Sequence, residues 1–518
     1  MNEDSSSKRS VVIVGGGTAG WMAAAALSRF VPPDCTITLV ESEEIGTVGV
    51  GESTIPQMTV FNQCLGIDEA EFLRETSGTC KLGIEFVDWL RPGHRYFHGF
   101  GSVGRDLGLV PFHHYWLRSR ALGNQNGLSA YSPTAMAARE GRFGRPAAVD
   151  GPARLAFGYA YHIDAIAYAR YLRRYAEKGG VQRIEGRIVG VDRDPQSGDI
   201  CVLRTADGRE IDGDLFFDCS GFAALLIGRA LDVGFEDWSH WLPCDRAWAA
   251  PSTNRGAPLP FTRSTAREAG WQWRIPLQHR AGNGIVYSSA HVTDDAARED
   301  LLGSIEGELL LDPRQLRFTT GRRTRMWERN CIALGLAGGF LEPLEATSIY
   351  LVQSGVARAL RYFSGGPIAE ADRTAFNAET EFEYAAIRDF LILHYHANQR
   401  VGEPFWDYCR TMPVPETLAH KMALFRANGR IFRENLELFD VPSWLQVMWG
   451  QGIRPENYNP LADRVEAADL RATLEETARA TRHLVDRLPS LNEFLAASGA
   501  AIDPLAGGVI YKPGEASR

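Results

Sequence analysis

Lysine is scarce in this chain of 518 residues. It stands only at positions 8, 81, 178, 421 and 512, so arginine supplies 50 of the 55 basic residues. Lys81 lies within a patterned apolar segment, whereas the other lysines lie in tails or polar surroundings. The chain uses arginine wherever a positive charge suffices, which makes Lys81 a position to explain.

Paired cysteines, long apolar runs and an excess of positive charge are also missing. The eight cysteines show no C-x-x-C spacing, which predicts reduced thiols and a cytoplasmic protein. No apolar run reaches transmembrane length, and the polar start leads directly into a strand, so neither a membrane span nor a signal peptide is expected. The net charge of −9 argues against a nucleic-acid binder. His98, His113 and His114 lack a companion carboxylate at metal-ligand spacing, so no metal site is predicted.

The stretch at 11–27, VVIVGGGTAGWMAAAAL, carries the clearest motif. Its β-branched run predicts a buried parallel strand, and Trp21 to Leu27 predicts a helix. Between them, Gly15, Gly17 and Gly20 complete a G-x-G-x-x-G turn that lets helix N-terminal amides face a pyrophosphate. An ordinary β-turn-α unit is the alternative interpretation. The motif favours a dinucleotide site.

The next two segments extend this interpretation. A second strand is expected at 36–40, and Glu41 ends it about 20 residues after the turn, where an acid commonly holds a ribose hydroxyl. The glycine-rich loop at 46–56, GTVGVGESTIP, follows; cofactor contact is favoured over a flexible connector. In CKLGIEFVDW at 80–89, alternation predicts one strand with Lys81 and Glu85 on the face opposite Leu82. That pattern alone favours a solvated lysine.

The middle of the chain predicts β-structure and aromatic clusters. Segments 96–101 (YFHGFG) and 111–116 (PFHHYW) fit either core or a small-molecule pocket. Turn signals at 194–198 and 207–208 predict hairpins. The strand in LFFDCSG at 215–221 returns to the cofactor in a manner typical of two-domain flavoproteins.

Two later motifs carry chemistry. In GWQWRIP at 270–276, Trp271, Trp273 and Ile275 share one face of an expected strand. Segment 331–350 predicts a strand at 332–334 and then a helix with Pro343 near its first turn. Amides near that N-terminus favour an anion. Glu342 and Glu345 are as well explained as first-turn acids as by a catalytic role.

Beyond residue 350 the pattern becomes helical. Segments 372–398, 415–433 and 467–488 have helical periodicity. We therefore predict two parts, with residues 1–365 forming the cofactor-binding part and 366–518 forming a mainly helical part that completes the substrate pocket.

Together these residues resemble the flavin-dependent tryptophan halogenases and their indole-halogenating relatives, over nearly the whole chain. The matching motifs are GGGTAG, VGVGESTIP, GWQWRIP and GFLEPLEATSIY. The resemblance implies an α/β fold: an FAD-binding Rossmann-like domain of the glutathione-reductase and hydroxybenzoate-hydroxylase type with a mixed β-sheet, plus a mainly α-helical C-terminal substrate region.

The resemblance also implies roles for individual residues. The family's lysine and glutamate fall on Lys81 and Glu345, and its halide-binding amides match Thr347 and Ser348. Four further residues would form the substrate side: His98, Phe100, Trp271 and Trp273. The residues implied for FAD binding are Gly15, Gly17, Thr18, Ala19, Gly20, Glu41, Gly49, Val50, Gly51, Glu52, Leu336 and Gly338.

The activity implied is FADH2- and O2-dependent installation of chloride or bromide on an electron-rich aromatic ring, through a flavin hydroperoxide and hypohalous acid. Lys81 would hydrogen-bond hypohalous acid or form a haloamine, which arginine cannot do because it stays protonated. Glu345 would polarise the electrophile or accept the arene proton.

Partners and substrate are less closely defined. The chain has no separate NADH-binding module, so a partner flavin reductase is expected, and a homodimer is compatible with the sequence. The residues that clamp the amino-acid carboxylate in tryptophan halogenases do not align onto 437–463. A free, substituted, peptide-linked or carrier-bound indole is therefore expected as readily as tryptophan. A flavin-dependent aromatic monooxygenase and a non-catalytic flavin protein are the alternatives.

Overall fold

The β-branched run after the N-terminus forms an inner strand of a six-stranded sheet. The computed structural model describes residues 9–44, 51–145, 156–363 and 367–502. The sheet is parallel except for its edge strand β20, and the side chains of Val11 to Val14 are at most 3% exposed. In spatial order its strands are β20 (Trp327–Glu328), β21 (Cys331–Ala333), β12 (Leu215–Asp218), β1 (Ser10–Val14), β2 (Thr36–Glu41) and β8 (Gln182–Glu185).

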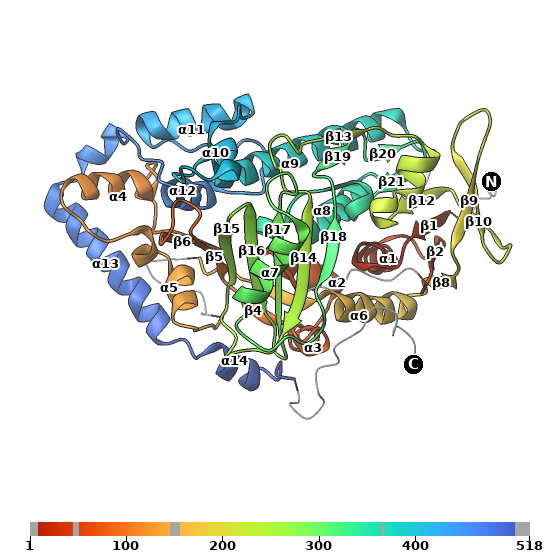
Figure 1. Ribbon diagram of the computed structural model, residues 1–518, viewed down its shortest axis with the longest axis horizontal. Coiled ribbons are helices and arrows are strands. Elements are labelled where there is room, and N and C mark those ends of the chain that lie inside the picture. The colour runs from red at the N-terminus through yellow and green to blue at the C-terminus, as the bar shows by residue number, and fades with distance from the viewer. Residues whose placement is uncertain (1–8, 45–50, 146–155, 364–366, 503–518) are drawn as a thin grey trace, which may run out of the picture.

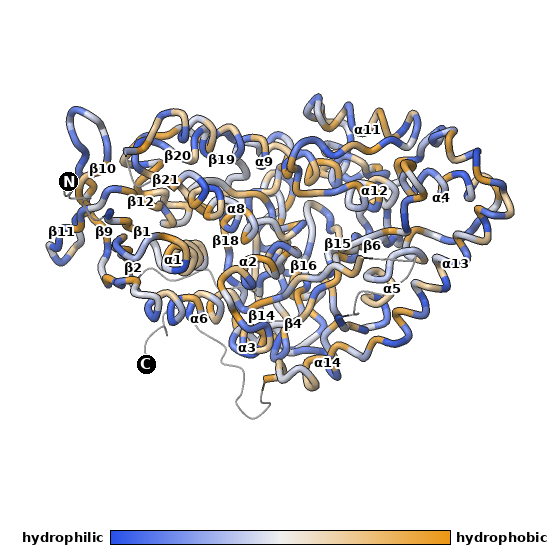
Figure 2. Tube along the Cα trace, turned by 180° about the vertical axis from the view of Figure 1, so that it is seen from behind, coloured by the Kyte–Doolittle hydropathy of each residue, from blue (hydrophilic) through white to orange (hydrophobic). Residues whose placement is uncertain are grey.

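Three helices pack together beside this sheet. α1 (Thr18–Phe30) starts directly after the glycine turn and packs against α6 (Ala165–Lys178) and α8 (Ser348–Arg361). Every residue of α1 from 20 to 27 is buried, because its alanines allow neighbouring backbones to come close. Figure 2 shows α1 as largely hydrophobic, whereas α6 alternates between polar and apolar residues. The predicted strand–turn–helix unit is confirmed.

The predicted hairpins also form. β9 (Ile188–Arg193), β10 (Ile200–Thr205) and β11 (Glu210–Asp212) make a small antiparallel sheet at one end of the molecule (Figure 1). Asp194 accepts hydrogen bonds from the backbone amides of Gln196 and Ser197 in the first turn, which explains why that sequence reverses the chain.

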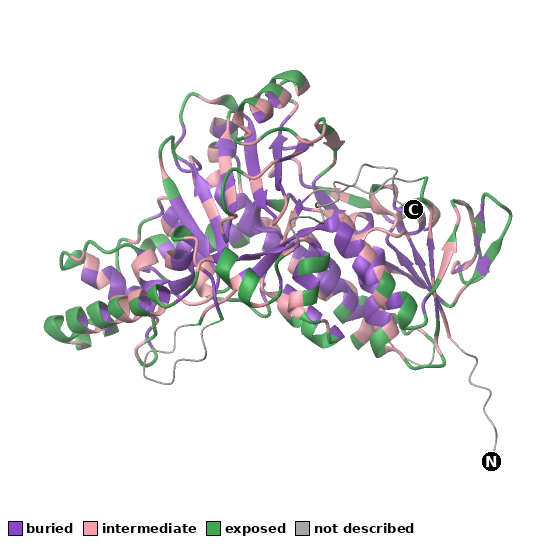
Figure 3. Ribbon diagram, turned by 90° about the horizontal axis from the view of Figure 1, so that it is seen from below, coloured by how far each residue is buried: buried purple, intermediate pink, exposed green. Residues whose placement is uncertain are grey.

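A seven-stranded sheet forms the second layer. It is antiparallel except where β5 pairs with β15, and the predicted GWQWRIP strand is its central β16. Figure 3 shows that its strands are mostly buried. In order they are β18 (Arg314–Arg317), β14 (Arg246–Ser252), β17 (Ala281–Tyr287), β16 (Gly270–Pro276), β15 (Thr262–Arg267), β5 (Gly83–Val87) and β6 (Arg95–Gly99).

The prediction of one continuous strand around Lys81 is wrong. The β-structure is interrupted at Leu82. Lys81 is therefore the last residue of β4 (Thr79–Lys81), while Glu85 lies in the next strand, β5. β4 belongs to a separate three-stranded sheet with β7 (Ala160–Asp164) and β3 (Gly51–Ser53). Lys81 and Glu85 therefore lie in different sheets, and alternation along the segment could not place them relative to each other.

The C-terminal segments are helical, as predicted, although they do not form the helical part alone. α13 packs against α4 (Phe112–Ala121) and α5 (Pro133–Arg139), and α12 packs against β6 (Figure 1). The boundary at residues 365 and 366 stays a prediction. The C-terminal helices are α9 (Glu370–His396), α10 (Pro404–Thr411), α11 (Glu416–Asn428), α12 (Val441–Gly450), α13 (Ala467–Asp486) and α14 (Leu491–Ala497).

The remaining elements connect these layers. All eight cysteines are free. Within the described part of the chain, no helix is both long and apolar enough to cross a membrane. The connecting elements are α2 (Gln57–Leu65), α3 (Glu69–Glu75), α7 (Asp294–Ser304), β13 (Phe235–Asp237), β19 (Gly321–Arg323) and β22 (Gly339–Phe340).

Candidate active site

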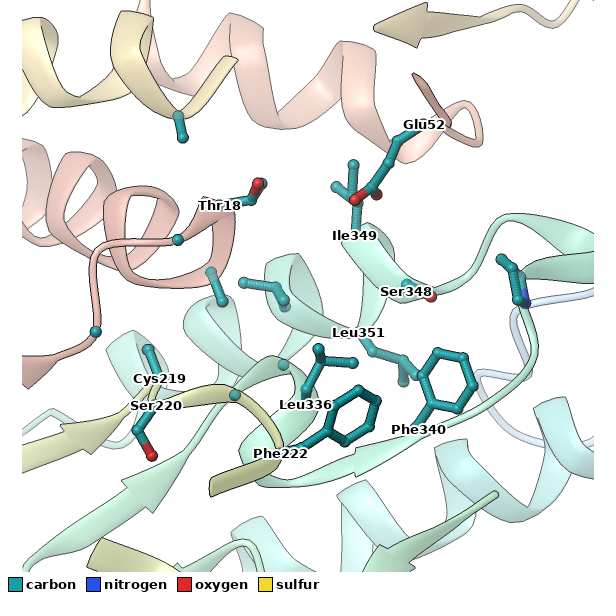
Figure 4. Close-up of a pocket in the computed structure, with 18 of the residues that line it drawn as sticks. Thr18, Glu52, Cys219, Ser220, Phe222, Leu336, Phe340, Ser348, Ile349 and Leu351 are labelled. Atoms are coloured by element: carbon teal, nitrogen blue, oxygen red, sulfur yellow. The ribbon is translucent and has the colours of Figure 1, made fainter. Parts of the chain in front are cut away.

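A cavity of about 680 Å³ lies where the glycine turn between β1 and α1 meets the seven-stranded sheet. The carboxyl end of β2, the loop after β12 and the start of α8 complete its walls. Figure 4 shows Thr18, Glu52 and Ser348 around this space, together with the rings of Phe222 and Phe340. Ligands of open parallel sheets bind at this edge, outside the carboxyl ends of the strands.

The glycine turn is shaped for a large ligand. An added Cβ at Gly17, which lines the cavity, would meet no described atom within 4 Å, whereas one at Gly20 would lie 1.8 Å from the carbonyl oxygen of Gly15. Gly17 therefore leaves open space for a ligand, and Gly20 allows α1 to pack closely on the turn. Backbone donors, an open cradle and a long cavity suit a dinucleotide such as FAD.

Most residues expected to bind the cofactor line this cavity. Gly20 and Gly338 do not line it, and a Cβ at Gly338 would instead meet the sulfur of Met326. Gly49 and Val50 lie outside the described residues. The expected residues that line the cavity are Gly15, Gly17, Thr18, Ala19, Glu41, Gly51, Glu52 and Leu336.

Two carboxyl groups face the cavity in different environments. Glu41 accepts a hydrogen bond from Arg183 Nε at 2.5 Å, and an added Cβ at Gly16 would collide with its carboxylate. Burial raises the pKa of Glu52 to about 7, and the nearby charge of Asp164 adds to this effect. Glu41 is therefore ion-paired with Arg183, whereas Glu52 changes charge near neutral pH.

Lys81 is fully buried, which contradicts the solvated lysine that the pattern favoured. Its Nζ donates a hydrogen bond to the carbonyl oxygen of Thr54 at 2.9 Å and lies 5.1 Å from the ring centre of Phe100. Burial lowers the pKa of Lys81 to about 7, although the charge of Glu345 opposes the shift. A substantial fraction of this amine is therefore neutral at physiological pH.

Glu345 is held between two histidines. Nδ1 of His98 lies 3.0 Å from both carboxylate oxygens, and Nε2 of His394 lies 2.9 Å from Oε1. Burial alone would raise the pKa of Glu345, but the two imidazoles outweigh it and hold the pKa at about 2. Because Glu345 is 1% exposed, it is not a solvated first-turn acid but a buried, ionised carboxylate.

The segment after Glu345 turns sharply. Pro343, expected near the first turn of the next helix, begins a short 3₁₀ turn (Pro343–Glu345), and α8 starts at Ser348. Ala346 has φ of 59°. A left-handed alanine is strained, and such strain gathers at functional sites. Ala346 and Ser348 line the cavity.

Ala346 links the cavity to the lysine site. It also packs in one cluster with Phe100, the ring above which Lys81 Nζ lies. Thr347, the next residue, is fully buried, and its Oγ1 has no hydrogen-bond partner among the described residues. A buried polar atom without a partner is costly, and it indicates room for a ligand at this position.

The tryptophans of GWQWRIP form part of the cavity wall. Trp271 and Trp273 both line it, with ring centres 6.0 Å apart. Nε1 of Trp271 donates to Oε2 of Glu342 at 2.9 Å, so Glu342 is also buried rather than a solvated first-turn acid. The prediction that Trp271, Trp273 and Ile275 share one face of a strand is confirmed, since all three line the cavity.

An aromatic cluster surrounds the histidine that holds Glu345. The ring of His98 lies 6.5 Å from that of Phe100 and 5.8 Å from that of Phe390, which stacks on Phe439 at 3.8 Å. Trp444 packs edge-on against Phe390. These rings offer an apolar setting beside Lys81 and Glu345, which suits a planar aromatic ligand.

Sequence reasoning missed His394 and Thr54. His394 was identified only as one of several residues at helical spacing in α9, and nothing in that pattern separates a core histidine from one that contacts Glu345. Thr54 contributes a main-chain oxygen, which no side-chain motif reveals. Among the described residues, no three His, Cys, Asp or Glu side chains come together as a metal site would require.

Comparison with known proteins identifies the family. The family model described as tryptophan halogenase matches residues 10–467. This chain belongs to the tryptophan halogenase family. Its fold class and its dependence on flavin, both expected from the motifs, are confirmed, and the family member described here is an enzyme whose cofactor is FAD.

Individual family members differ in how similar they are to this chain. Tryptophan 7-halogenase RebH from Lentzea aerocolonigenes is 33% identical, with 94% of this chain and 98% of RebH covered. Xcc4156, a flavin-dependent halogenase from Xanthomonas campestris, is 50% identical with a TM-score of 0.92, over 95% of this chain and 98% of its own. BrvH, a flavin-dependent halogenase from Brevundimonas sp. BAL3, is 47% identical with a TM-score of 0.91, over 95% and 99%.

Proposed function

We propose that this halogenase installs chloride or bromide on the ring of an indole or another electron-rich arene, with Lys81 and Glu345 acting on the oxidised halogen and on the ring. The observation that carries this proposal is the burial of Lys81 with its Nζ over Phe100 and within the field of Glu345. Reduced FAD, when bound in the cavity, supplies the oxygen-activating chemistry that oxidises halide.

Lys81 directs the electrophile. Its amine lies outside the FAD cavity lining, on the side of Phe100 and the aromatic cluster. A pKa near 7 permits both roles that the resemblance implies, since the ammonium can donate a hydrogen bond to hypohalous acid and the neutral amine can form a haloamine. Arginine would permit only the first.

Glu345 stabilises the positive charge on the halogenated ring and accepts its proton. Halogen attack on an arene gives a cation that must lose a proton, and an ionised carboxylate stabilises that cation. A pKa of about 2 keeps Glu345 ionised, and its contacts with His98 and His394 fix its position. The two histidines are therefore part of the arrangement that keeps this carboxylate charged in an apolar setting.

Halide binds at the turn before α8. The free amides at the start of this 14-residue helix favour an anion, and Thr347 and Ser348 occupy that position. The unpartnered Oγ1 of Thr347 supplies a further donor. Ser348 lines the FAD cavity, so a halide here would lie beside the cofactor.

The substrate is proposed to be an indole without an obligatory free amino-acid group. Within 437–463, Glu437 is ion-paired with Lys421 at 2.9 Å, and Asp463 is paired with Arg118 at 3.0 Å. Each of these carboxylates therefore already has a basic partner within the protein. RebH is named a tryptophan 7-halogenase, whereas Xcc4156 and BrvH are described only as flavin-dependent halogenases.

Reduced FAD is proposed to come from a separate flavin reductase, because the sequence holds one dinucleotide fingerprint and the cavity built on it serves FAD. We expect the enzyme to work in the cytoplasm, where its free thiols stay reduced. A homodimer remains compatible with the sequence.

A mass-spectrometric assay tests this proposal. The enzyme is incubated with FAD, a flavin reductase, NADH, bromide or chloride, and a panel of indoles that includes tryptophan. A halogen isotope pattern on a product supports the proposal, and the best substrate defines the pocket. Addition of oxygen without halogen would instead favour an aromatic monooxygenase. Glu345→Gln should slow product formation without loss of FAD binding, and normal turnover by this variant would remove Glu345 from the mechanism.

A further inference from the structure

Glu342 is a second buried carboxyl group, three residues before Glu345, that the proposed chemistry does not use. Its side chain is fully buried, and its Oε2 accepts hydrogen bonds from Nε1 of Trp271, at 2.9 Å, and from the hydroxyl of Tyr395. Trp271 lines the FAD cavity, whereas Glu342 lies behind that wall. The carboxyl group therefore connects a cavity-wall indole to helix α9.

The other carboxyl oxygen lacks a partner. Oε1 of Glu342 is buried and accepts no hydrogen bond from any described residue. An ionised carboxylate with one unsolvated oxygen would be very unfavourable, whereas a proton on Oε1 removes the charge and leaves Oε2 free to accept both bonds. In agreement, burial raises the pKa of Glu342 to about 7, against the opposing effect of its two donors.

The surrounding groups do not supply a compensating charge. Glu342 lies close enough to raise the pKa of three titratable groups, which are Tyr395 on α9, Cys244 before β14, and Cys409 on α10. Burial raises the pKa of each of these three groups, so all are neutral at physiological pH. Sγ of Cys244 lies 3.7 Å from the hydroxyl of Tyr395, which extends the polar chain by one neutral member.

Adjacent residues of α9 thus reach two carboxyl groups of opposite character. His394 lies against Glu345, which is held ionised with a pKa of about 2, and Tyr395 donates to Glu342. When the surroundings of two neighbouring carboxyl groups give them different pKa values, the two groups can take different roles. One carboxyl serves as a charge at the reacting ring, and the other serves as a neutral acceptor behind the cofactor wall.

We propose that Glu342 is a positioning residue that, as a neutral carboxylic acid held by Tyr395, fixes the indole of Trp271 on the wall of the FAD cavity. The wall must keep its shape so that O2 reduction by bound FADH2 oxidises halide, which then passes toward Lys81, and does not end in release of hydrogen peroxide without halide oxidation; in this respect the inference rests on the proposed function. The protonation of Glu342 and its hydrogen bond to Trp271 do not depend on the proposed function.

The first experiment uses the protein without FAD. Infrared difference spectra at pH 6, below the pKa of about 7 of Glu342, between the wild type and Glu342→Gln should show loss of one protonated-carboxyl carbonyl band. Glu345→Gln, the matched change three residues away, should not remove such a band because Glu345 is ionised. Glu52, whose pKa is also about 7, contributes a band of its own that remains in Glu342→Gln and is assigned by its loss in Glu52→Gln. A difference between the wild type and Glu342→Gln that contains no protonated-carboxyl band would overturn the neutral acid.

The second experiment follows the indole N–H resonance of Trp271, assigned by its loss in Trp271→Phe. Glu342→Leu removes the acceptor and should shift this resonance, whereas Glu342→Gln keeps a neutral acceptor and should leave it near its wild-type position. An unmoved resonance in Glu342→Leu would overturn the positioning role. If Glu342→Leu does not fold, Tyr395→Phe removes one holding bond, and the proposal requires the same resonance to shift or broaden.

A third experiment measures how much hydrogen peroxide is released for each molecule of halogenated product. With FAD, reductase and substrate, Glu342→Leu should release more peroxide per halogenated product than the wild type, and Glu342→Gln should restore the wild-type ratio. Equal ratios in all three proteins would overturn the role of Glu342 in the wall. If no substrate in the panel is halogenated by the wild type, the proposed function fails, while the infrared and resonance results still decide the placement of Trp271.

Discussion

Nε2 of His394 lies 2.9 Å from Oε1 of Glu345, and neither side chain is more than 1% exposed. The other ring nitrogen, Nδ1, lies 2.9 Å from the carbonyl oxygen of Phe390. The imidazole of His394 therefore lies between two oxygen atoms, one from the carboxylate and one from the main chain. His98 contacts the same carboxylate, with its Nδ1 3.0 Å from each oxygen of Glu345.

Replacing His394 with Gln should raise the pKa of Glu345 from about 2, by roughly 1–3, because the hydrogen bond and the electrostatic interaction with the imidazole both lower that pKa. Since Glu345 must be ionised to act, the acidic limb of the pH profile of kcat/KM should move upward by the same amount. His396→Gln is a matched control, because His396 lies on the same helix but contacts the carbonyl oxygen of Cys409. An unchanged acidic limb in His394→Gln would contradict this pairing.

Lys81→Ala should reduce halogenation by at least about a hundredfold, which is the lower range for loss of an acid–base group. FAD affinity should not change, because Lys81 does not line the cavity.

The pH profile of wild-type halogenation separates the two possible roles of Lys81. Activity that rises through pH 7 indicates the neutral amine and a haloamine, whereas activity that falls indicates the ammonium as donor. Lys81→Arg should retain halogenation only if Lys81 acts as a hydrogen-bond donor. Retained halogenation by Lys81→Ala would exclude both the donor role and the haloamine role.

Lys81→Met should stabilise the apo-protein, because a buried amine is replaced by an apolar chain of similar length. The pKa of Lys81 falls from 10.5 to about 7 on folding, so the unfolded chain binds more protons between these values and wild-type stability rises with pH there. The Tm of Lys81→Met should therefore exceed that of the wild type most below pH 7, by about 2 °C or more. The difference in Tm should shrink toward pH 10.5. Calorimetry of both proteins at pH 6 and pH 9 measures it, and an advantage that grows with pH would be inconsistent with a desolvated amine.

Gly17→Val should abolish FAD binding without unfolding the protein. Gly17 has a φ of −74°, which valine tolerates, and the added side chain would enter the open space of the cavity. Gly303→Ala is the control, since its Cβ also meets no described atom within 4 Å and Gly303 does not line the cavity. Quenching of flavin fluorescence measures affinity and thermal melting reports folding. Normal FAD binding by Gly17→Val would show that the dinucleotide lies elsewhere.

The affinity for FAD should fall as pH rises through 7. The pKa of Glu52 is raised to about 7, so this cavity residue is neutral below that pH and negatively charged above it, where it repels the pyrophosphate. The dissociation constant measured by titration should increase about tenfold between pH 6 and pH 8. Glu52→Gln should bind FAD with little pH dependence. A wild-type affinity that improves with pH would contradict this assignment.

Much of the fold was predictable because short-range patterns encode it. The run before the glycine turn, the hairpin turn at Asp194 and the alternation in GWQWRIP each depend on neighbours within a few residues. Helical periodicity likewise located α9, α11 and α13. Alternation failed around Lys81 because one residue, Leu82, ends one strand before another begins, and such a break leaves no mark in the pattern.

The candidate site was predictable only as a set of residue types. The scarcity of lysine and the family motifs selected Lys81 and Glu345, yet the sequence left Lys81 as either solvated or catalytic and Glu345 as either a first-turn acid or a base. Packing decides between these interpretations, because desolvation lowers the pKa of Lys81 while two imidazoles from β6 and α9 lower that of Glu345. Glu342 has the same residue type and nearly the same place in the chain, but its neighbours are an indole and a phenol.

The sequence by itself determined where the chain turns, which faces of its strands and helices are apolar, and which family it belongs to. These properties follow from local backbone preferences and from motifs that lie within one segment. Only the tertiary structure decided which carboxyl carries charge, which amine is desolvated, and which indole faces the cofactor cavity. Those properties depend on groups from β6, α9 and the turn before α8, which are far apart in the chain, and electrostatic energies depend on distance in space.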